Sequence, residues 1–119
     1  MSFDWREYLQ LAKKLAGQPV ACVVEGEYRS GVSRAYYAAY CYARKRARDQ
    51  LGFRPSHKAD DHWRIRDFLE KHGQSAAAKS LLDLRDARTT CDYDDTTSTD
   101  PALLLLKAIC DAQDVIEGL

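Results

Sequence analysis

Four alanines recur at every fourth position in the middle of the chain, and this spacing constrains the fold more than any other feature of the sequence. They are Ala35, Ala39, Ala43 and Ala47. On a helix such positions share one face, where small side chains let another backbone approach closely. The larger residues beside this alanine seam are Val32, Tyr36 and Tyr40. The pattern predicts a packed helix over residues 25–51, roughly 40 Å long at about 1.5 Å per residue, as the central element of the fold.

A shorter helix is expected before the long one. Ser2 or Asp4 is placed to cap it, and Gly17 with Pro19 ends it. Its apolar positions, spaced three or four apart, are Trp5, Leu9, Ala12 and Leu15. Residues 20–24 are rich in valine, but a strand there would have no partner. They are expected to form a buried connector or the first turn of the long helix.

Two helices are expected after Gly52. Ser56 is predicted to cap the first of them, which reaches about His72, and Ser75 is predicted to cap the second, which reaches residue 93. The apolar residues expected from the first of these are Trp63, Ile65, Phe68 and Leu69.

The last helix has the clearest start. Asp100 precedes Pro101, a strong helix-start signal, and the polar residues 94–100 before it lack periodicity and predict a loop. Its expected inner face consists of Leu105, Ala108, Ala112, Val115 and Leu119. The sequence therefore predicts an all-α fold, an up-and-down bundle of four to five helices in a single domain over residues 1–119.

Composition narrows the class of protein. No apolar run approaches the length of about 18 residues that spans a bilayer, and the first residues do not resemble a signal peptide, so a cytoplasmic protein without membrane contact is expected. The four cysteines are Cys22, Cys41, Cys91 and Cys110. None belongs to a C-x-x-C pair, so they are expected to be reduced and buried, with no metal or cofactor.

Charge is balanced in total but not along the chain. The 18 basic and 18 acidic residues give a net charge of zero, which argues against strong bulk attraction to nucleic acid. Residues 28–58, however, hold eight basic residues against one acid, Asp49. This run indicates either a local basic surface or an ordinary solvated helix face.

Two groups of residues are candidates for a site. Arg85, Arg88 and Asp92 are spaced three and four apart, which places guanidinium groups suited to phosphate on one helix face. The alternative is a simple ion pair between Arg88 and Asp92. The second group lies among the clustered tyrosines, where Arg34 and Tyr37 form a weaker patch for stacked bases. The alternative there is that the tyrosines belong to the core.

Three segments in order resemble the HEPN family of small helical domains. They are SRAYYAAY at residues 33–40, PSH at residues 55–57 and RTTCDYD at residues 88–94. The resemblance implies a bundle of four or five helices that forms a homodimer. Many members of that family are metal-independent endoribonucleases, often toxins paired with a nucleotidyltransferase antitoxin, and others bind nucleotides or are inactive partners.

The chain departs from the nuclease pattern of that family. The pattern places a histidine after Arg88, whereas this chain has Tyr93, and no histidine follows His72. A phenol with an ordinary pKa of about 10 is a poor base at neutral pH, although it can donate a proton. Arg88 would still bind a phosphate, so binding would survive better than turnover.

The hypothesis is therefore a nucleotide- or RNA-associated binding module, partner of a small nucleotidyltransferase in a toxin–antitoxin or defence-type pair. Its expected ligand-binding residues are Arg85, Arg88, Asp92, Tyr93, Arg34, Tyr37 and His57. In the first alternative the chain is a ribonuclease toxin in which Arg88 acts with Tyr93 or His57. In the second it is a purely structural docking partner, because the four leucines at residues 103–106 exceed what one core face needs. Those leucines alternatively belong to a helix buried on all sides.

Overall fold

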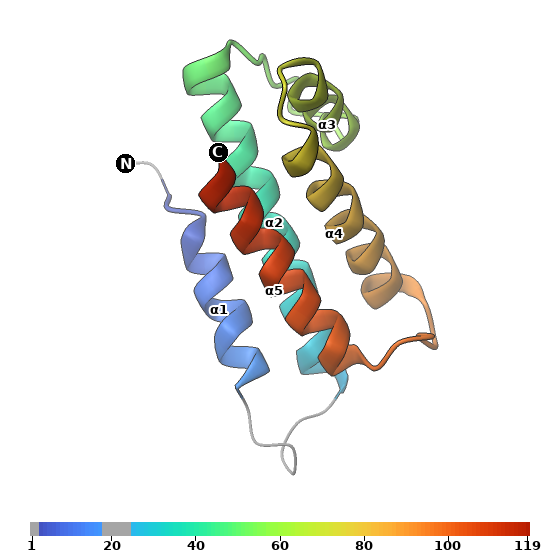
Figure 1. Ribbon diagram of the computed structural model, residues 1–119. Coiled ribbons are helices and arrows are strands. Elements are labelled where there is room, and N and C mark those ends of the chain that lie inside the picture. Colours follow the sequence, from blue (N-terminus) through green and yellow to red (C-terminus); the bar gives the residue numbers. More distant parts are fainter. Residues whose placement is uncertain (1–2, 18–24) are drawn as a thin grey trace.

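The fold is an all-α bundle, as the sequence predicts. The computed structural model describes residues 3–17 and 25–119, which form five helices and no strand (Figure 1). The helices are α1 (Arg6–Ala16), α2 (Glu25–Leu51), α3 (Asp61–Lys71), α4 (Ser75–Tyr93) and α5 (Pro101–Gly118). In Figure 1, α1, α2, α4 and α5 run alternately down and up, and the short α3 lies across the top beside α4. Helix α2 contacts each of the other four helices.

The alanine seam lies at the centre of this bundle. All four of its alanines are buried, as are the flanking Val32, Tyr36 and Tyr40. Helix α2 begins and ends where the sequence predicts, at Glu25 and Leu51. The prediction that a small-residue face lets other helices approach is therefore confirmed, and α2 is the element against which the rest of the chain packs.

Several predicted helix ends are also confirmed. Gly52 and Gly73 follow α2 and α3 with φ values of 84° and 77°, in the left-handed region that glycine adopts without steric cost. Asp100 caps α5, because its carboxylate accepts a hydrogen bond of 2.9 Å from the Ala102 amide. At α1, Asp4 accepts from the Arg6 amide at 3.0 Å. Ser2 and residues 18–24, including Cys22, lie outside the described residues.

The start of the third helix was predicted wrongly. Helix α3 begins at Asp61 and not beside Ser56, because the Asp61 carboxylate accepts hydrogen bonds from the Ser56 and His57 amides and holds residues 56–60 as a loop. Trp63 was expected in the core but is 59% exposed. It lies two residues before the buried Ile65, which is about 200° around the helix. Ser75, predicted as the cap of α4, is its first residue; the N-cap position is Gln74, which makes no side-chain capping hydrogen bond.

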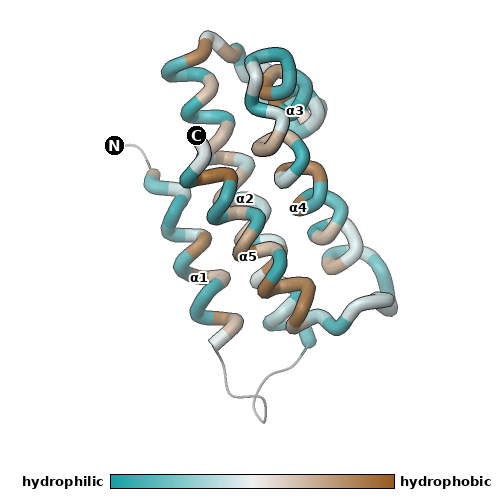
Figure 2. The backbone as a smooth tube through the Cα atoms, in the orientation of Figure 1, coloured by the Kyte–Doolittle hydropathy of each residue, from teal (hydrophilic) through white to brown (hydrophobic). Residues whose placement is uncertain are grey.

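Helix α5 buries one face and exposes another. Its predicted inner residues Leu105, Ala108, Ala112 and Val115 are buried, whereas Leu119 is only partly buried. Leu103 and Leu106 are 58% and 53% exposed, so the helix is not buried on all sides. Figure 2 shows this hydrophobic stretch at the start of α5. Cys110 is also exposed, contrary to prediction, because its position follows the outward face of Leu103 and Leu106, while Cys41 and Cys91 are buried.

The described helices give no membrane span. Within residues 3–17 and 25–119, none combines the length and the apolarity that a bilayer crossing requires.

The contact between α2 and α5 yields a stability prediction. A Cβ added at Gly31 would lie 2.8 Å and 2.9 Å from the two δ carbons of Leu105, which is fully buried. We expect Gly31→Ala to lower the free energy of unfolding by about 1–2 kcal/mol, because overpacking outweighs the better helix propensity of alanine. Urea unfolding measures the change. Gly26→Ala is the matched control, since nothing lies within 4 Å of its added Cβ. Equal stability of the two variants would contradict this account of the contact.

Candidate functional site

A groove lies between α1, α2 and the loop that leads into α3. It encloses about 670 Å³, within the usual size range of ligand sites. We call it the basic groove. Its lining residues are Trp5, Tyr8, Arg34, Tyr37, Tyr40, Cys41, Arg44, His57, Lys58, Ala59, Asp61 and His62. Aromatic and basic side chains therefore form most of its wall.

The two arginines of the basic groove lie against aromatic rings. The Arg34 guanidinium carbon is 4.9 Å from the centre of the Tyr8 ring and 5.9 Å from that of Tyr37. Arg44 is 5.4 Å from the Tyr40 ring centre and 6.0 Å from that of Trp5. These distances are typical of cation–π contacts, which orient a guanidinium without neutralising it. Both groups remain charged and able to donate hydrogen bonds to an anion.

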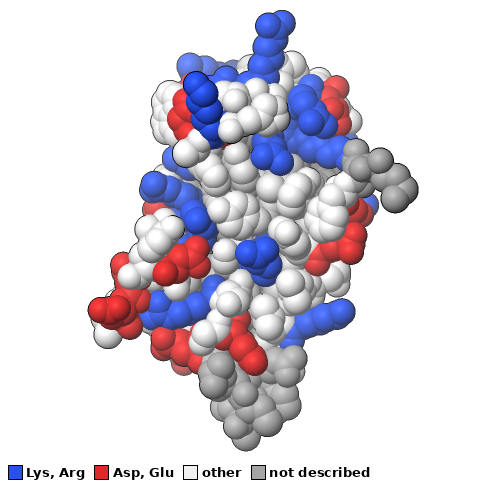
Figure 3. Space-filling view, turned by 180° about the vertical axis from the view of Figure 1, so that it is seen from behind, with Lys and Arg blue, Asp and Glu red and all other residues white. Residues whose placement is uncertain are grey.

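The positive charge in the basic groove is not compensated locally. Across the described parts of the chain, Arg34, Arg44 and Lys58 form no ion pair, whereas acids outside the groove pair with other basic residues, as Asp67 pairs with Lys71. The single acid in the lining, Asp61, is 1% exposed. In Figure 3, Lys and Arg side chains are frequent on the upper part of the back face, next to a mostly uncharged area. A neutral protein thus carries a locally basic surface.

Asp61 organises the loop at one end of the basic groove. Its carboxylate accepts hydrogen bonds from the Ser56 amide at 3.0 Å, the Ser56 hydroxyl at 2.7 Å, the His57 amide at 2.9 Å and Arg64 Nη1 at 2.6 Å. Burial alone would raise the pKa of Asp61, but these hydrogen bonds outweigh burial and hold the pKa well below its ordinary value. The anchored loop includes His57, whose φ of 61° is unusual for a residue other than glycine.

His62 connects the basic groove to the core. Its Nδ1 is hydrogen-bonded to the Tyr36 hydroxyl, and its ring stacks on Tyr40 with 4.1 Å between ring centres. Burial lowers the pKa of His62 below its ordinary value, and the charges of Arg88 and Arg66 lower it further. Burial also raises the pKa of Tyr36. Both side chains are therefore neutral around pH 7.

Arg88 reaches the same tyrosines from α4. Its guanidinium carbon is 5.1 Å from the Tyr37 ring centre and 5.7 Å from that of Tyr36. Its Nε lies 3.1 Å from Asp92 Oδ2, but the two are not aligned for a hydrogen bond. The Arg88–Asp92 pair is therefore an electrostatic contact and not a hydrogen bond. Both predicted patches thus meet at Tyr37, which contacts Arg34 as well as Arg88.

The other predicted site residues are placed differently. His57 lines the basic groove together with Arg34 and Tyr37. Tyr93 is 72% exposed and follows Arg88 by five residues, which is about 140° around the helix. Arg85 is exposed and lies 3.5 Å from Asp86. The structure therefore brings Arg34, Tyr37, His57 and the Arg88–Asp92 pair to one region. In the part of the chain that the structure describes, no contact joins Tyr93 or Arg85 to it.

Reasoning from the sequence left several residues of this region out of the predicted site. The main ones are Trp5, Tyr8, Arg44, Lys58, Asp61 and His62. Trp5 lies just before α1 and Tyr8 within it, and no periodicity within α2 points to them. Arg44 belongs to the basic run over residues 28–58, and that run is its one signal in the sequence. His62 is defined by its contact with Tyr36, which depends on how α3 packs on α2.

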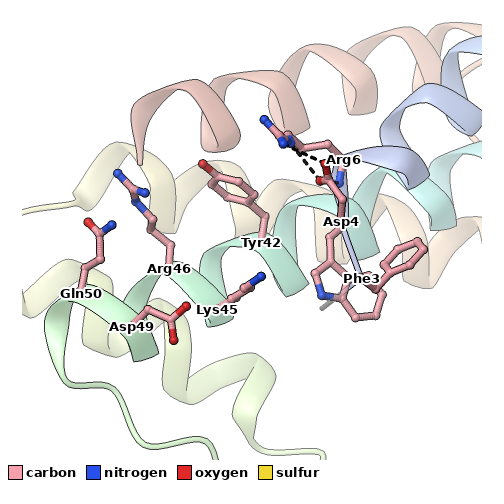
Figure 4. A pocket seen from close by; sticks show the side chains of 9 residues that line it. Phe3, Asp4, Arg6, Tyr42, Lys45, Arg46, Asp49 and Gln50 are labelled. Atoms are coloured by element: carbon pink, nitrogen blue, oxygen red, sulfur yellow. Dashed lines mark hydrogen bonds and ion pairs between the residues drawn. The ribbon is translucent and has the colours of Figure 1, made fainter. Parts of the chain in front are cut away.

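A smaller hollow of about 420 Å³ lies beside the start of α1 and the C-terminal half of α2 (Figure 4). Most of the charged side chains that line this hollow have an ion-pair or hydrogen-bond partner. Asp4 pairs with Arg6, as the dashed lines in Figure 4 show, and this hydrogen bond lowers the pKa of Asp4 to about 2. Asp49 pairs with Arg48, and Arg46 donates to the Leu119 carbonyl at 2.8 Å. The basic groove is therefore the stronger candidate for an anionic ligand.

The described residues form no metal site. No group of three or more His, Cys, Asp or Glu side chains among them is arranged to hold a metal ion. Comparison of the chain with protein-family models, with curated proteins and with solved structures found no match. The assignment of a function therefore depends on the geometry of the basic groove.

Proposed function

We propose that the chain is a nucleotide- or RNA-binding module whose basic groove binds single-stranded RNA. One observation carries the proposal: Arg34 and Arg44 lie on aromatic rings in one open groove and form no ion pair with any described residue. Guanidinium edges suit phosphate oxygens, and tyrosine faces suit unstacked bases. A duplex would not offer its bases to these rings, so the groove chemistry favours a single strand.

The length of the basic groove favours several linked nucleotides over one. Arg34 and Arg44 are ten residues apart on α2, which separates their backbones by about 15 Å along the helix axis. A mononucleotide carries its phosphates close together, whereas a strand repeats them along its length. Lys58 lines the same groove and forms no ion pair with any described residue, so it adds a third cation. A short oligonucleotide therefore uses more of these cations than a single nucleotide does.

The proposal predicts a measurable preference among ligands. By fluorescence anisotropy, we expect the protein to bind a labelled single-stranded RNA of about twelve nucleotides, within the range of known site sizes. Binding to a duplex of the same length, and competition by AMP, should each be at least about tenfold weaker. Arg34→Ala should weaken binding about tenfold. Arg48→Ala removes the same charge from α2 outside the groove and should have no such effect. Absence of RNA binding at low salt would refute the proposal.

The ribonuclease alternative is tested with the same samples. It requires Tyr93 or His57 to act with Arg88, yet Tyr93 projects from a different side of α4 and is largely exposed. A binding module leaves the RNA intact on a denaturing gel, without magnesium and at high protein excess. Cleavage that Arg88→Ala abolishes would establish the alternative.

A second candidate function is protein docking through the outer face of α5. Leu103 and Leu106 are both more than half exposed there, which supports an interface with a nucleotidyltransferase-type partner or with a second copy in a homodimer. Sedimentation of the chain alone and with such a partner distinguishes the two. Leu106→Asp should abolish the complex, whereas Arg34→Ala should leave it unchanged. If the chain sediments as a monomer alone and forms no complex with the partner, both interfaces are rejected.

A further inference from the structure

We propose that Tyr36 fixes His62 as a neutral imidazole with its proton on Nε2, and that this N–H donates a hydrogen bond to an oxygen atom of the ligand in the basic groove. Tyr36 is then a positioning residue and His62 a ligand-binding residue. The ligand rests on the proposed function, whereas the state of His62 does not.

The direction of the hydrogen bond follows from burial. Tyr36 is 1% exposed, and among the described residues the only hydrogen-bond partner of its hydroxyl is His62 Nδ1. If Nδ1 carried a proton and donated, the buried Tyr36 O–H would have no acceptor, which is costly. The hydroxyl therefore donates and Nδ1 accepts. A neutral imidazole that accepts at Nδ1 carries its proton on Nε2.

The charges around His62 favour the same state. Aromatic and charged side chains from three helices lie around His62. Helix α2 contributes Tyr36, Tyr37, Tyr40 and Arg44, α3 contributes Asp61 and Arg66, and α4 contributes Arg88. His57 and Lys58 line the same groove. The three arginines around His62 outnumber the one carboxylate, that of Asp61. This carboxylate already accepts hydrogen bonds from Ser56, His57 and Arg64. A second proton on His62 would add positive charge here and reverse its hydrogen bond with Tyr36, which would leave the buried Tyr36 O–H without an acceptor.

The chemical consequence concerns what His62 does in the basic groove. With Nδ1 taken, Nε2 is the nitrogen left for a ligand, and His62 lines the groove. An Nε2–H group donates to a phosphate, ribose or base oxygen, but it has no lone pair with which to accept a proton. His62 thus holds a ligand atom in place and does not act as a general base from the groove side. This role fits binding without cleavage.

The state of His62 is tested without any ligand, by nitrogen NMR of the labelled full chain between about pH 5 and 8. His62→Gln assigns the signal. We expect the Nε2–H tautomer, still neutral below the ordinary pKa of 6.5. Tyr36→Phe should raise the titration midpoint by about half a pH unit to one unit, the equivalent of one hydrogen bond. Tyr37→Phe is the control, because its ring lies 6.3 Å from His62 without a hydrogen bond, and should not shift it. An Nδ1–H tautomer, or no shift in Tyr36→Phe, would overturn the proposal.

The role of His62 in binding is tested by amide replacements. Glutamine places an N–H near the position of Nε2, whereas asparagine places its amide nearer Nδ1. His62→Gln should bind the labelled RNA within about threefold of the wild type, and His62→Asn should bind about tenfold more weakly. Equal binding by both variants would overturn the role in the groove. If no variant and no wild type binds RNA, the proposed function fails, and the NMR experiment still decides the state of His62.

Discussion

Asp61→Ala is expected to lower the free energy of unfolding by about 3 kcal/mol, because it removes a buried acceptor of several charge-assisted hydrogen bonds. The Asp61 side chain is only 2% exposed, and its carboxylate is bonded by Ser56, His57 and Arg64. Without it, the amides of Ser56 and His57 lose their acceptor. Urea unfolding at pH 7 measures the change.

The effect of Asp61→Ala should depend on pH in a defined direction. Because the pKa of Asp61 is lowered by folding, its carboxylate stabilises the protein fully above the unfolded value of 3.8. That stabilisation is lost as the pH falls through the lower folded value. The stability difference between wild type and Asp61→Ala should therefore be constant near neutrality and shrink in acid. A difference that grows as the pH falls would contradict the assigned role.

Asp60→Ala is the matched control for this prediction. Asp60 is exposed, and among the described residues its carboxylate accepts only from the Ser56 hydroxyl, at 3.2 Å. We expect a loss below about 1 kcal/mol, typical of an exposed hydrogen bond. If the two variants were equally destabilised, the loop would depend on the total negative charge and not on the Asp61 carboxylate.

Replacing both groove arginines should have the largest effect on binding. For Arg34→Ala combined with Arg44→Ala, we expect the affinity for single-stranded RNA to fall about a hundredfold, or about tenfold for each lost phosphate contact. The slope of log affinity against log salt concentration should also become less steep by about 1.4, since each contacted single-strand phosphate contributes about 0.7 to it. Anisotropy titrations at several salt concentrations give both quantities.

A double variant outside the basic groove separates specific contacts from net charge. Arg48→Ala with Lys79→Ala also removes two positive charges, from residues that form ion pairs with Asp49 and Asp83. It should keep the salt slope of the wild type. The same loss in both double variants would show that the RNA responds to total charge, and the assignment of the groove would be wrong.

The helices were predictable because their signals are local. The alanine seam, the glycines after α2 and α3, and the pair Asp100–Pro101 each act within a few residues, and each has the predicted outcome. The start of α3 was not predictable in this way. Ser56 is a good capping residue by type, but its amide is bound by Asp61, five positions later. Local propensity favoured a helix start that the loop geometry overrode.

The candidate site was only partly predictable for the same reason. Arg34, Tyr37, His57 and Arg88 were singled out from the sequence as separate patches, and the packing of α2 against α4 and the loop before α3 brings them together. The contribution of Tyr8 from α1 has no local signal. Tyr93 belongs to the same sequence motif as Arg88, but five residues along a helix place its side chain about 140° away around the axis, where it is exposed.

The sequence by itself determined five helices, the long one among them at its observed bounds, and the all-α class, because hydrophobic spacing and capping residues act over one or two helical turns. Only the tertiary structure decided which charges remain unpaired. Pairing depends on which side chains from distant segments come within a few ångströms of one another. The composition of this chain, 18 basic and 18 acidic residues, gives no sign that Arg34 and Arg44 would share a groove without an ion pair to any described residue.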